Sequence, residues 1–89
     1  MRVVWDERKA DLNARNHGVT FEEAATVFSD PLALIIEDVG HPENARIIGE
    51  SEALRILLVV FVERDEDVLR LISARRATRH ERRRYEEGE

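Results

Sequence analysis

Residues 54–73, Leu54-Arg-Ile-Leu-Leu-Val-Val-Phe-Val-Glu-Arg-Asp-Glu-Asp-Val-Leu-Arg-Leu-Ile-Ser73, decide the fold. Leu54–Glu63 begins with an apolar run that only Arg55 interrupts, which is typical of a central strand covered on both faces. Asp65-Glu66-Asp67 is a tight acidic turn, and the alternation in Val68–Ser73 favours a second strand. The stretch therefore predicts a long central strand and a neighbour that returns antiparallel to it.

The N-terminal third predicts a short strand and two helices. Arg2–Trp5 is β-branched and aromatic, which favours a strand. Asp6 can cap a helix that ends at His17, where a glycine supplies the stop. Thr20 has capping-box spacing to Glu23. Apolar residues recur there with the spacing of a second helix, at Phe21, Ala24, Ala25 and Phe28.

The rest of the chain adds two strands and a last helix. Leu32–Glu37 and Arg46–Glu50 predict strands on either side of a loop with Gly, Pro and Asn. Thr78 and Glu81 repeat the capping-box spacing and start a helix that reaches about Glu87. Its few apolar residues predict loose docking, or support by a partner. The order predicts one α+β domain over residues 1–89, a small antiparallel sheet with two N-terminal helices packed on it and a C-terminal helix.

Composition narrows the class of protein further. A chain of 89 residues forms one small domain, and the absence of cysteine excludes disulfides and thiolate metal sites. The longest apolar run is about half the length that crosses a bilayer. The N-terminal residues turn acidic too soon for a secretory signal, so we expect a cytoplasmic protein without membrane contact. No metal-ligand motif or glycine-rich phosphate loop occurs, so we expect no metal ion and no cofactor.

Charge is distributed unevenly along the chain. Residues 70–84 hold seven arginines and one acidic residue, a formal charge of +6, whereas the whole chain carries −5. The planar guanidinium of arginine donates two parallel hydrogen bonds to phosphate and keeps its charge at neutral pH. The segment therefore predicts an RNA-binding surface and raises the hypothesis of RNA cleavage.

A set of residues in this order resembles BrnT-type toxins. They are Trp5-Asp6, Lys9-Ala10, Asn13, His17-Gly18-Val19, Phe21-Glu22-Glu23-Ala24, Val27-Phe28, Asp30-Pro31, Ile72-Ser-Ala-Arg75, Ala77, Glu81 and Tyr85. The resemblance spans nearly the whole chain and departs from the family at Glu7, where proline is usual. It implies a RelE-like fold and the toxin half of a type II toxin–antitoxin pair, which arrests translation by cleaving RNA.

The resemblance also implies a partner. The antitoxin of this family, BrnA, is a ribbon-helix-helix protein, so operator DNA is contacted only through it. Because such proteins dimerise, we expect a heterotetramer with two copies of each chain. A cationic site is most simply silenced by an acidic or amphipathic segment, so we expect the antitoxin to cover part of residues 64–85.

Metal-free RNA cleavage needs a base, an acid and cations at one phosphate. Arg75 is the favoured cation, with Arg64 beside it unless the two lie at opposite ends of the sheet. His17, from the family pattern, and His80 are candidates for proton transfer. Tyr85 can stack on a base or donate a proton. Further phosphate contacts are expected from Arg70, Arg76, Arg79, Arg82 and Lys9.

Each candidate also has a structural interpretation. Arg75 can be a solvated strand-end residue, and Lys9 and His80 can be exposed first-turn residues of their helices. His17 can be a helix C-terminal cation, or a histidine packed against the strands. Tyr85 can be the apolar anchor of the last helix, and the spacing of Glu81 favours capping over catalysis. Two other functions stay open: a non-catalytic RNA- or ribosome-binding module, and a structural subunit of a DNA-binding repressor complex.

Overall fold

The structure is a computed structural model that describes residues 1–88. One sheet has its five strands in the order β1-β5-β4-β3-β2. The strands are β1 (Arg2–Val4), β2 (Leu34–Glu37), β3 (Ala45–Glu50), β4 (Ile56–Asp65) and β5 (Val68–Arg76). The helices are α1 (Glu7–His17), α2 (Phe21–Thr26), the short 3-10 helix η1 (Val27–Ser29) and α3 (Arg79–Glu87). The predicted α+β class is confirmed. No helix among these residues is long and apolar enough to cross a membrane.

The hairpin of β4 and β5 forms as the apolar run and the acidic turn predict. Its strands pair antiparallel, from Leu57 opposite Arg76 to Asp65 opposite Val68. β1 instead runs parallel to β5. The sheet is therefore mixed, whereas the sequence predicted an antiparallel one. Parallel strands are joined by long crossovers, and here most of the chain separates the two. Local sequence therefore carries no signal of this pairing.

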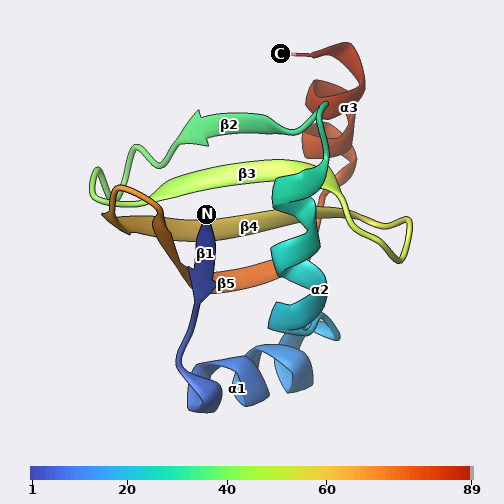
Figure 1. The fold of residues 1–89 in the computed structure, drawn as a ribbon. Coiled ribbons are helices and arrows are strands. Elements are labelled where there is room, and N and C mark those ends of the chain that lie inside the picture. Colours follow the sequence, from blue (N-terminus) through green and yellow to red (C-terminus); the bar gives the residue numbers. More distant parts are fainter. Residues whose placement is uncertain (89) are drawn as a thin grey trace.

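The two faces of the sheet carry different helices (Figure 1). α1 and α2 pack on what we call the inner face, where alternate strand residues and helix residues form one buried cluster. Its fully buried members include Val19, Phe21, Val27, Leu57, Val59 and Leu71. α3 lies on the opposite side, the outer face, against β3. Strand alternation turns the buried Ile48 and Leu58 toward that side.

The outer face is only partly covered. α3 has nine residues, a length of about 13 Å, so it covers only the end of the sheet near Ile48 and Leu58. Further along β4, Val60 and Val62 point outward and are half-buried. The prediction that the central strand is covered on both faces is therefore wrong for this half of it. An open stretch of sheet remains beside α3.

The capping residues predicted for α1 and α3 are found at the ends of these helices. Asp6 accepts a hydrogen bond from Arg8 N at 2.8 Å. Gly18 ends α1 with a φ of 68°, a left-handed conformation that glycine adopts without strain. Thr78 and Glu81 form a complete capping box at the start of α3.

The capping box predicted for Thr20 and Glu23, at the start of α2, is only half formed. Thr20 Oγ1 accepts from Glu23 N at 3.0 Å, as expected. The Glu23 carboxylate does not return to Thr20; it accepts from Ser51 Oγ at 2.7 Å and from Arg55 Nε at 2.9 Å. Arg55 also donates to Gly18 O at 3.1 Å. The charge-assisted hydrogen bond from Arg55 replaces the hydrogen bond from the Thr20 backbone that a capping box would have. Arg55, the one arginine in the apolar run, thereby connects the start of β4 to α2.

A buried amide joins α1 to β5. Asn13 is 6% exposed, and its Nδ2 donates to Val19 O at 2.9 Å and to Ala74 O at 2.8 Å. Its Oδ1 accepts from Ala74 N at 3.0 Å. These hydrogen bonds explain how a polar residue is tolerated on the packed side of α1.

Candidate functional site

Arg75, the favoured cation, lies on the outer face near the end of β5. Its Nη1 and Nη2 donate to Glu81 Oε1 and Oε2 at 2.8 Å and 2.9 Å. The hydrogen bond from Arg75 lowers the pKa of Glu81, outweighing the opposing effect of burial. The Arg75 side chain is still 37% exposed, so it docks α3 and also meets solvent. Its proposed role toward RNA stays a prediction.

Arg64 lies at the far end of the hairpin from Arg75. Arg75 pairs with Leu58 on β4. Leu58 precedes Arg64 by six residues, or about 20 Å along a strand. Of the two arrangements left open by the sequence, the structure has the one in which these arginines are separated. They cannot hold the same phosphate.

Tyr85 ties the far end of α3 to the loop after η1. Its hydroxyl donates to Asp30 Oδ2 at 2.7 Å, and this hydrogen bond, with burial, raises the pKa of Tyr85 to about 12. Burial alone would raise the pKa of Asp30, but hydrogen bonds from Glu50 N, Tyr85 and Leu32 N outweigh it and lower the pKa. These contacts favour an anchoring role for Tyr85, through its hydroxyl group rather than as the apolar anchor considered from the sequence.

The remaining candidates divide between the two sides of the sheet. Lys9 and His17 are exposed on α1, on the inner side. After Arg55, Arg76 also helps to lower the pKa of Glu23, so it lies toward α2. His80 is exposed in the first turn of α3. Among these candidates, the structure brings only His80 to the C-terminal arginines.

α3 presents a row of exposed cations. The side chains of Arg79, Arg82 and Arg83 are exposed and form no hydrogen bond or ion pair with the described residues. His80 and Arg83 line a shallow surface depression together with Arg84 and Glu87. Three guanidinium groups are thus available to an anion outside the protein.

Arg46 and Arg70 extend this cationic surface over the open part of the outer face. Arg46 lies opposite Val60, and Arg70 opposite Val62, so the arginines flank the two half-buried valines. Arg46 Nη2 makes a long hydrogen bond of 3.4 Å to Glu37 O. Its buried Nε has no hydrogen-bond partner within residues 1–88. A buried donor without an acceptor from the protein is uncommon, so this N–H is available to water or to an acceptor from outside the protein.

Sequence reasoning missed Arg46. It stands in an acidic half of the chain, 24 residues before the cationic segment begins at Arg70. Only the pairing of β3 with β4 brings it to the outer face. Alternation in Arg46-Ile-Ile-Gly-Glu50 could have shown that Arg46 shares a face with Ile48, but not which side was open.

These residues form what we call the cationic face, which consists of Arg46, Arg70, Arg75, Arg79, His80, Arg82 and Arg83. The arginines can bind phosphate oxygens and stabilise added negative charge on phosphorus. His80 is the histidine of this face, and its imidazole can form hydrogen bonds to RNA. Within the described part of the chain, no three His, Asp or Glu side chains gather as a set of metal ligands.

Comparisons with known proteins agree on one family. Residues 5–81 match the family described as "Ribonuclease toxin, BrnT, of type II toxin-antitoxin system". The structure is similar to the 1.1 Å crystal structure of the ribonuclease toxin BrnT from Brucella abortus, with a TM-score of 0.72 and 28% identity. That match covers 89% of this chain and 99% of the Brucella chain. No curated protein matches the sequence.

Proposed function

Because the chain belongs to the BrnT family of ribonuclease toxins from type II toxin–antitoxin systems, we propose that it is an endoribonuclease that binds and cleaves RNA on its cationic face. The observation that carries this proposal is the gathering of arginines from β3, β5 and α3 on one side of an acidic chain. Cleavage of RNA in the cytoplasm would arrest translation and so account for toxicity.

The proposed reaction needs no metal ion. The neighbouring 2′-hydroxyl attacks phosphorus, the bond to the 5′-oxygen breaks, and a 2′,3′-cyclic phosphate forms. Arg46, Arg70 and Arg75 stabilise the charge that develops on the phosphoryl oxygens. The 2′-hydroxyl loses its proton as it attacks, and the leaving 5′-oxygen takes one up. His80 carries one of these two transfers and water the other, since His17 lies on the other side of the sheet. The exposed arginines of α3 hold the flanking phosphates.

The partner in this proposal is a ribbon-helix-helix antitoxin of the BrnA kind. Family membership implies an antitoxin, and such proteins dimerise, which leads to a complex with two copies of each chain. The complex would contact its operator through the antitoxin alone. A net charge of −5 on the toxin supports this division, because the acidic chain as a whole repels DNA.

A non-catalytic RNA-binding module is the second candidate. Arg75 is bound to Glu81 and Tyr85 to Asp30, so two of the proposed catalytic groups are already occupied. A protein that binds RNA without cutting it would use the same arginines. The two candidates differ only in whether RNA is cleaved.

The test is digestion of a defined RNA by the purified chain in excess chelator. We expect cleavage products that end in a 2′,3′-cyclic phosphate. Binding without cleavage, with or without added divalent ions, would select the non-catalytic module. Cleavage that chelator abolishes and a divalent ion restores would contradict the metal-free mechanism. Expression of the chain alone in bacteria, with growth and total RNA followed, tests the proposed toxicity.

A further inference from the structure

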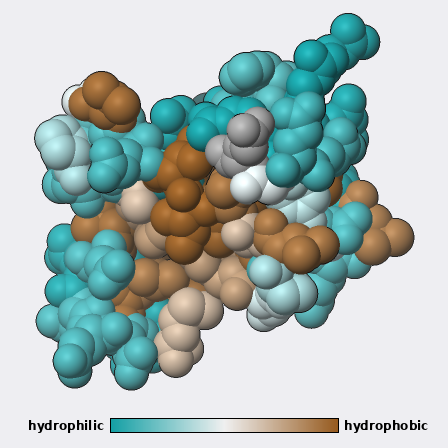
Figure 2. All heavy atoms as spheres, turned by 90° about the horizontal axis from the view of Figure 1, so that it is seen from above, coloured by the Kyte–Doolittle hydropathy of each residue, from teal (hydrophilic) through white to brown (hydrophobic). Residues whose placement is uncertain are grey.

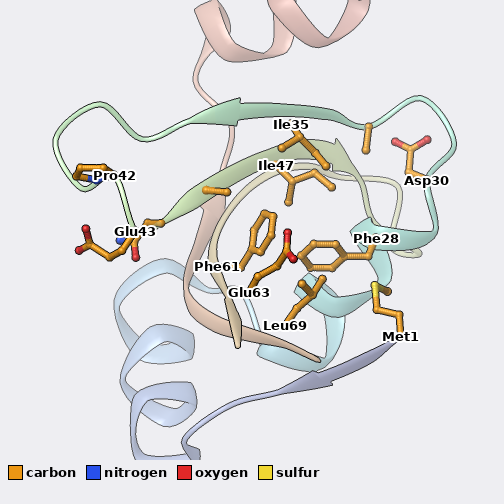
Figure 3. Close-up of a pocket in the computed structure, with 13 residues that line it drawn as sticks. Met1, Phe28, Asp30, Ile35, Pro42, Glu43, Ile47, Phe61, Glu63 and Leu69 are labelled. Carbon is orange, nitrogen blue, oxygen red and sulfur yellow. The ribbon is translucent and has the colours of Figure 1, made fainter. Parts of the chain in front are cut away.

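The inner face holds an open apolar groove next to the helices. Its volume is about 530 Å³. Figure 3 shows Phe28, Ile47 and Phe61 gathered at its centre, with Ile35 from β2 above them. The rings of Phe28 and Phe61 meet edge to face, with 5.0 Å between their centroids. Ile35 is 63% exposed, so a large apolar side chain stands at the mouth of an apolar site.

The apolar surface continues onto the edge of the sheet. β2 is the last strand in the sheet order, and Leu32 just before it is 74% exposed. Looking onto this edge, Figure 2 shows apolar side chains together in the middle of the view, surrounded by hydrophilic ones. A contiguous apolar surface with a polar border is typical of a site for another protein chain.

Acidic residues line the groove together with the apolar ones. Asp30, Glu43 and Glu63 contribute to its lining, and among residues 1–88 no lysine, arginine or histidine does. In Figure 3, Glu43 and Asp30 lie on opposite sides of the apolar residues. Hydrogen bonds outweigh burial and lower the pKa of Asp30, so this carboxylate is ionised at neutral pH. An occupant needs apolar side chains for the floor and cations at its borders.

This chemistry excludes two occupants. RNA is repelled by carboxylates at the border. A second copy of this chain has two helices with several basic residues, α1 and α3. α1 offers Leu12 as its one exposed large apolar side chain, which is too little for an apolar stripe. The described residues of α3 offer only Tyr85, which is hydrogen-bonded to Asp30. An amphipathic helix with lysines or arginines beside its apolar stripe satisfies both demands.

We infer that this groove docks a basic amphipathic helix of the antitoxin, on the opposite side of the sheet from the cationic face. The inference rests on the proposed function only in taking the antitoxin as the occupant. Apolar side chains of that helix would meet Phe28, Ile35 and Phe61, and its cations would face Glu43 and Glu63. The surface that holds the antitoxin is thus separate from the surface that binds RNA. It replaces the surface within residues 64–85 that the sequence led us to expect, because the acidic lining of the groove suits a basic helix and the cationic face does not.

The experiment measures binding of the ribbon-helix-helix protein encoded beside this chain, with two variants of the groove. Ile35→Lys should weaken binding on the order of 30-fold or more, since it places a charge in a central apolar contact. Glu63→Lys should weaken binding about tenfold, mainly through slower association that depends less on salt. Circular dichroism checks that both variants stay folded, which the exposure of both side chains favours.

Two matched controls lie outside the groove. Leu12→Lys changes an exposed leucine of α1, and Glu22→Lys reverses an exposed charge of α2. Both should bind like the wild type. Hydrogen exchange of the complex should slow at residues 33–36 and 44–47.

The outcomes separate the inference from the proposed function. Wild-type affinity of Ile35→Lys, or protection confined to residues 70–88, would overturn the groove as the docking site and leave the ribonuclease proposal intact. Absence of any complex with the wild-type chain would overturn both the groove and the proposed partner. Failure to cleave RNA, with the groove variants still impaired in binding, would overturn the ribonuclease proposal alone.

Discussion

At the scale of single residues, the contact with the clearest energetic consequence is the buried amide of Asn13. Asn13→Ala leaves Val19 O and both backbone groups of Ala74 without this partner at a buried position. We expect a loss of about 3 kcal/mol in the free energy of unfolding, measured by urea denaturation. Asn16→Ala, on the exposed side of the same helix, is the control and should change it by less than about 0.5 kcal/mol. A small loss for Asn13→Ala would mean that water or a rotated backbone replaces the amide.

Tyr85 offers a second prediction at this scale, because it is the only tyrosine in the chain. Phenolate absorbance of the folded protein should rise with a midpoint near its raised pKa of about 12. In the unfolded chain the same group ionises near its ordinary pKa of about 10. The hydrogen bond to Asp30 therefore stabilises the fold below pH 10 or so, and this contribution is lost as the pH rises through the higher value.

The comparison variant is Asp30→Asn, which should bring the tyrosine midpoint back toward the ordinary value. Circular dichroism recorded at each pH separates ionisation of the folded protein from alkaline unfolding. A native midpoint near 10 in the wild type would show that the hydroxyl is free, and would restore Tyr85 as a candidate proton donor.

At the scale of elements, α3 illustrates what sequence can and cannot predict. Its boundaries follow from the Thr78–Glu81 capping box. Its few apolar residues predicted loose docking, whereas the structure fixes it at both ends through Arg75–Glu81 and Tyr85–Asp30. These partners lie on other elements, and the second pair is 55 residues apart in the chain. Such contacts depend on topology, which local patterns do not contain.

The same limit applies to the candidate site. The cationic segment was visible as a run of arginines, and the cluster at α3 follows from it. Arg46 was not visible, because its place depends on the pairing of β3 with β4. The separation of Arg64 from Arg75 likewise follows from the register of the β4–β5 hairpin. The run of arginines in the sequence predicts where the basic surface lies. Which other arginines belong to it depends on how the strands pair.

The two polar contacts that hold α3, Arg75–Glu81 and Tyr85–Asp30, predict how α3 responds to acid. Glu81 and Asp30 both have lowered pKa values, Glu81 chiefly through Arg75. A carboxylate with a lowered pKa stabilises the fold above its unfolded pKa, and this stabilisation is lost as the pH falls through the folded value. We therefore expect α3 to detach first when the pH falls below about 4. NMR spectra of backbone amides along an acid titration measure this.

Glu81→Gln supplies the control for that titration. It removes the charge that Arg75 binds, so α3 should already be loosened at neutral pH and should respond less to acid. Glu66→Gln, in the exposed hairpin turn, should behave like the wild type. If the amide signals of α3 and of the sheet disappeared at the same pH in the wild type, the two polar contacts would not be what holds α3 on the sheet.

At the scale of the whole molecule, the sheet separates two surfaces of opposite character. Arginines from β3, β5 and α3 lie on the outer side, and an apolar groove with acidic borders lies on the inner side. Under the proposed function, this arrangement reconciles a net charge of −5 with the binding of a polyanion. Together the two proposals give one small domain an RNA site and a partner site that do not overlap.

The most direct test of the central claim is the rate at which the purified chain and its arginine variants cleave one single-stranded RNA in the presence of chelator. We expect Arg46→Ala and Arg75→Ala each to lower the rate on the order of 100-fold. The control, Arg15→Ala on the exposed side of α1, should cleave at the wild-type rate. Melting temperatures and circular dichroism exclude unfolding as the cause. Cleavage by folded Arg46→Ala and Arg75→Ala proteins at the wild-type rate would contradict the assignment of RNA cleavage to the cationic face.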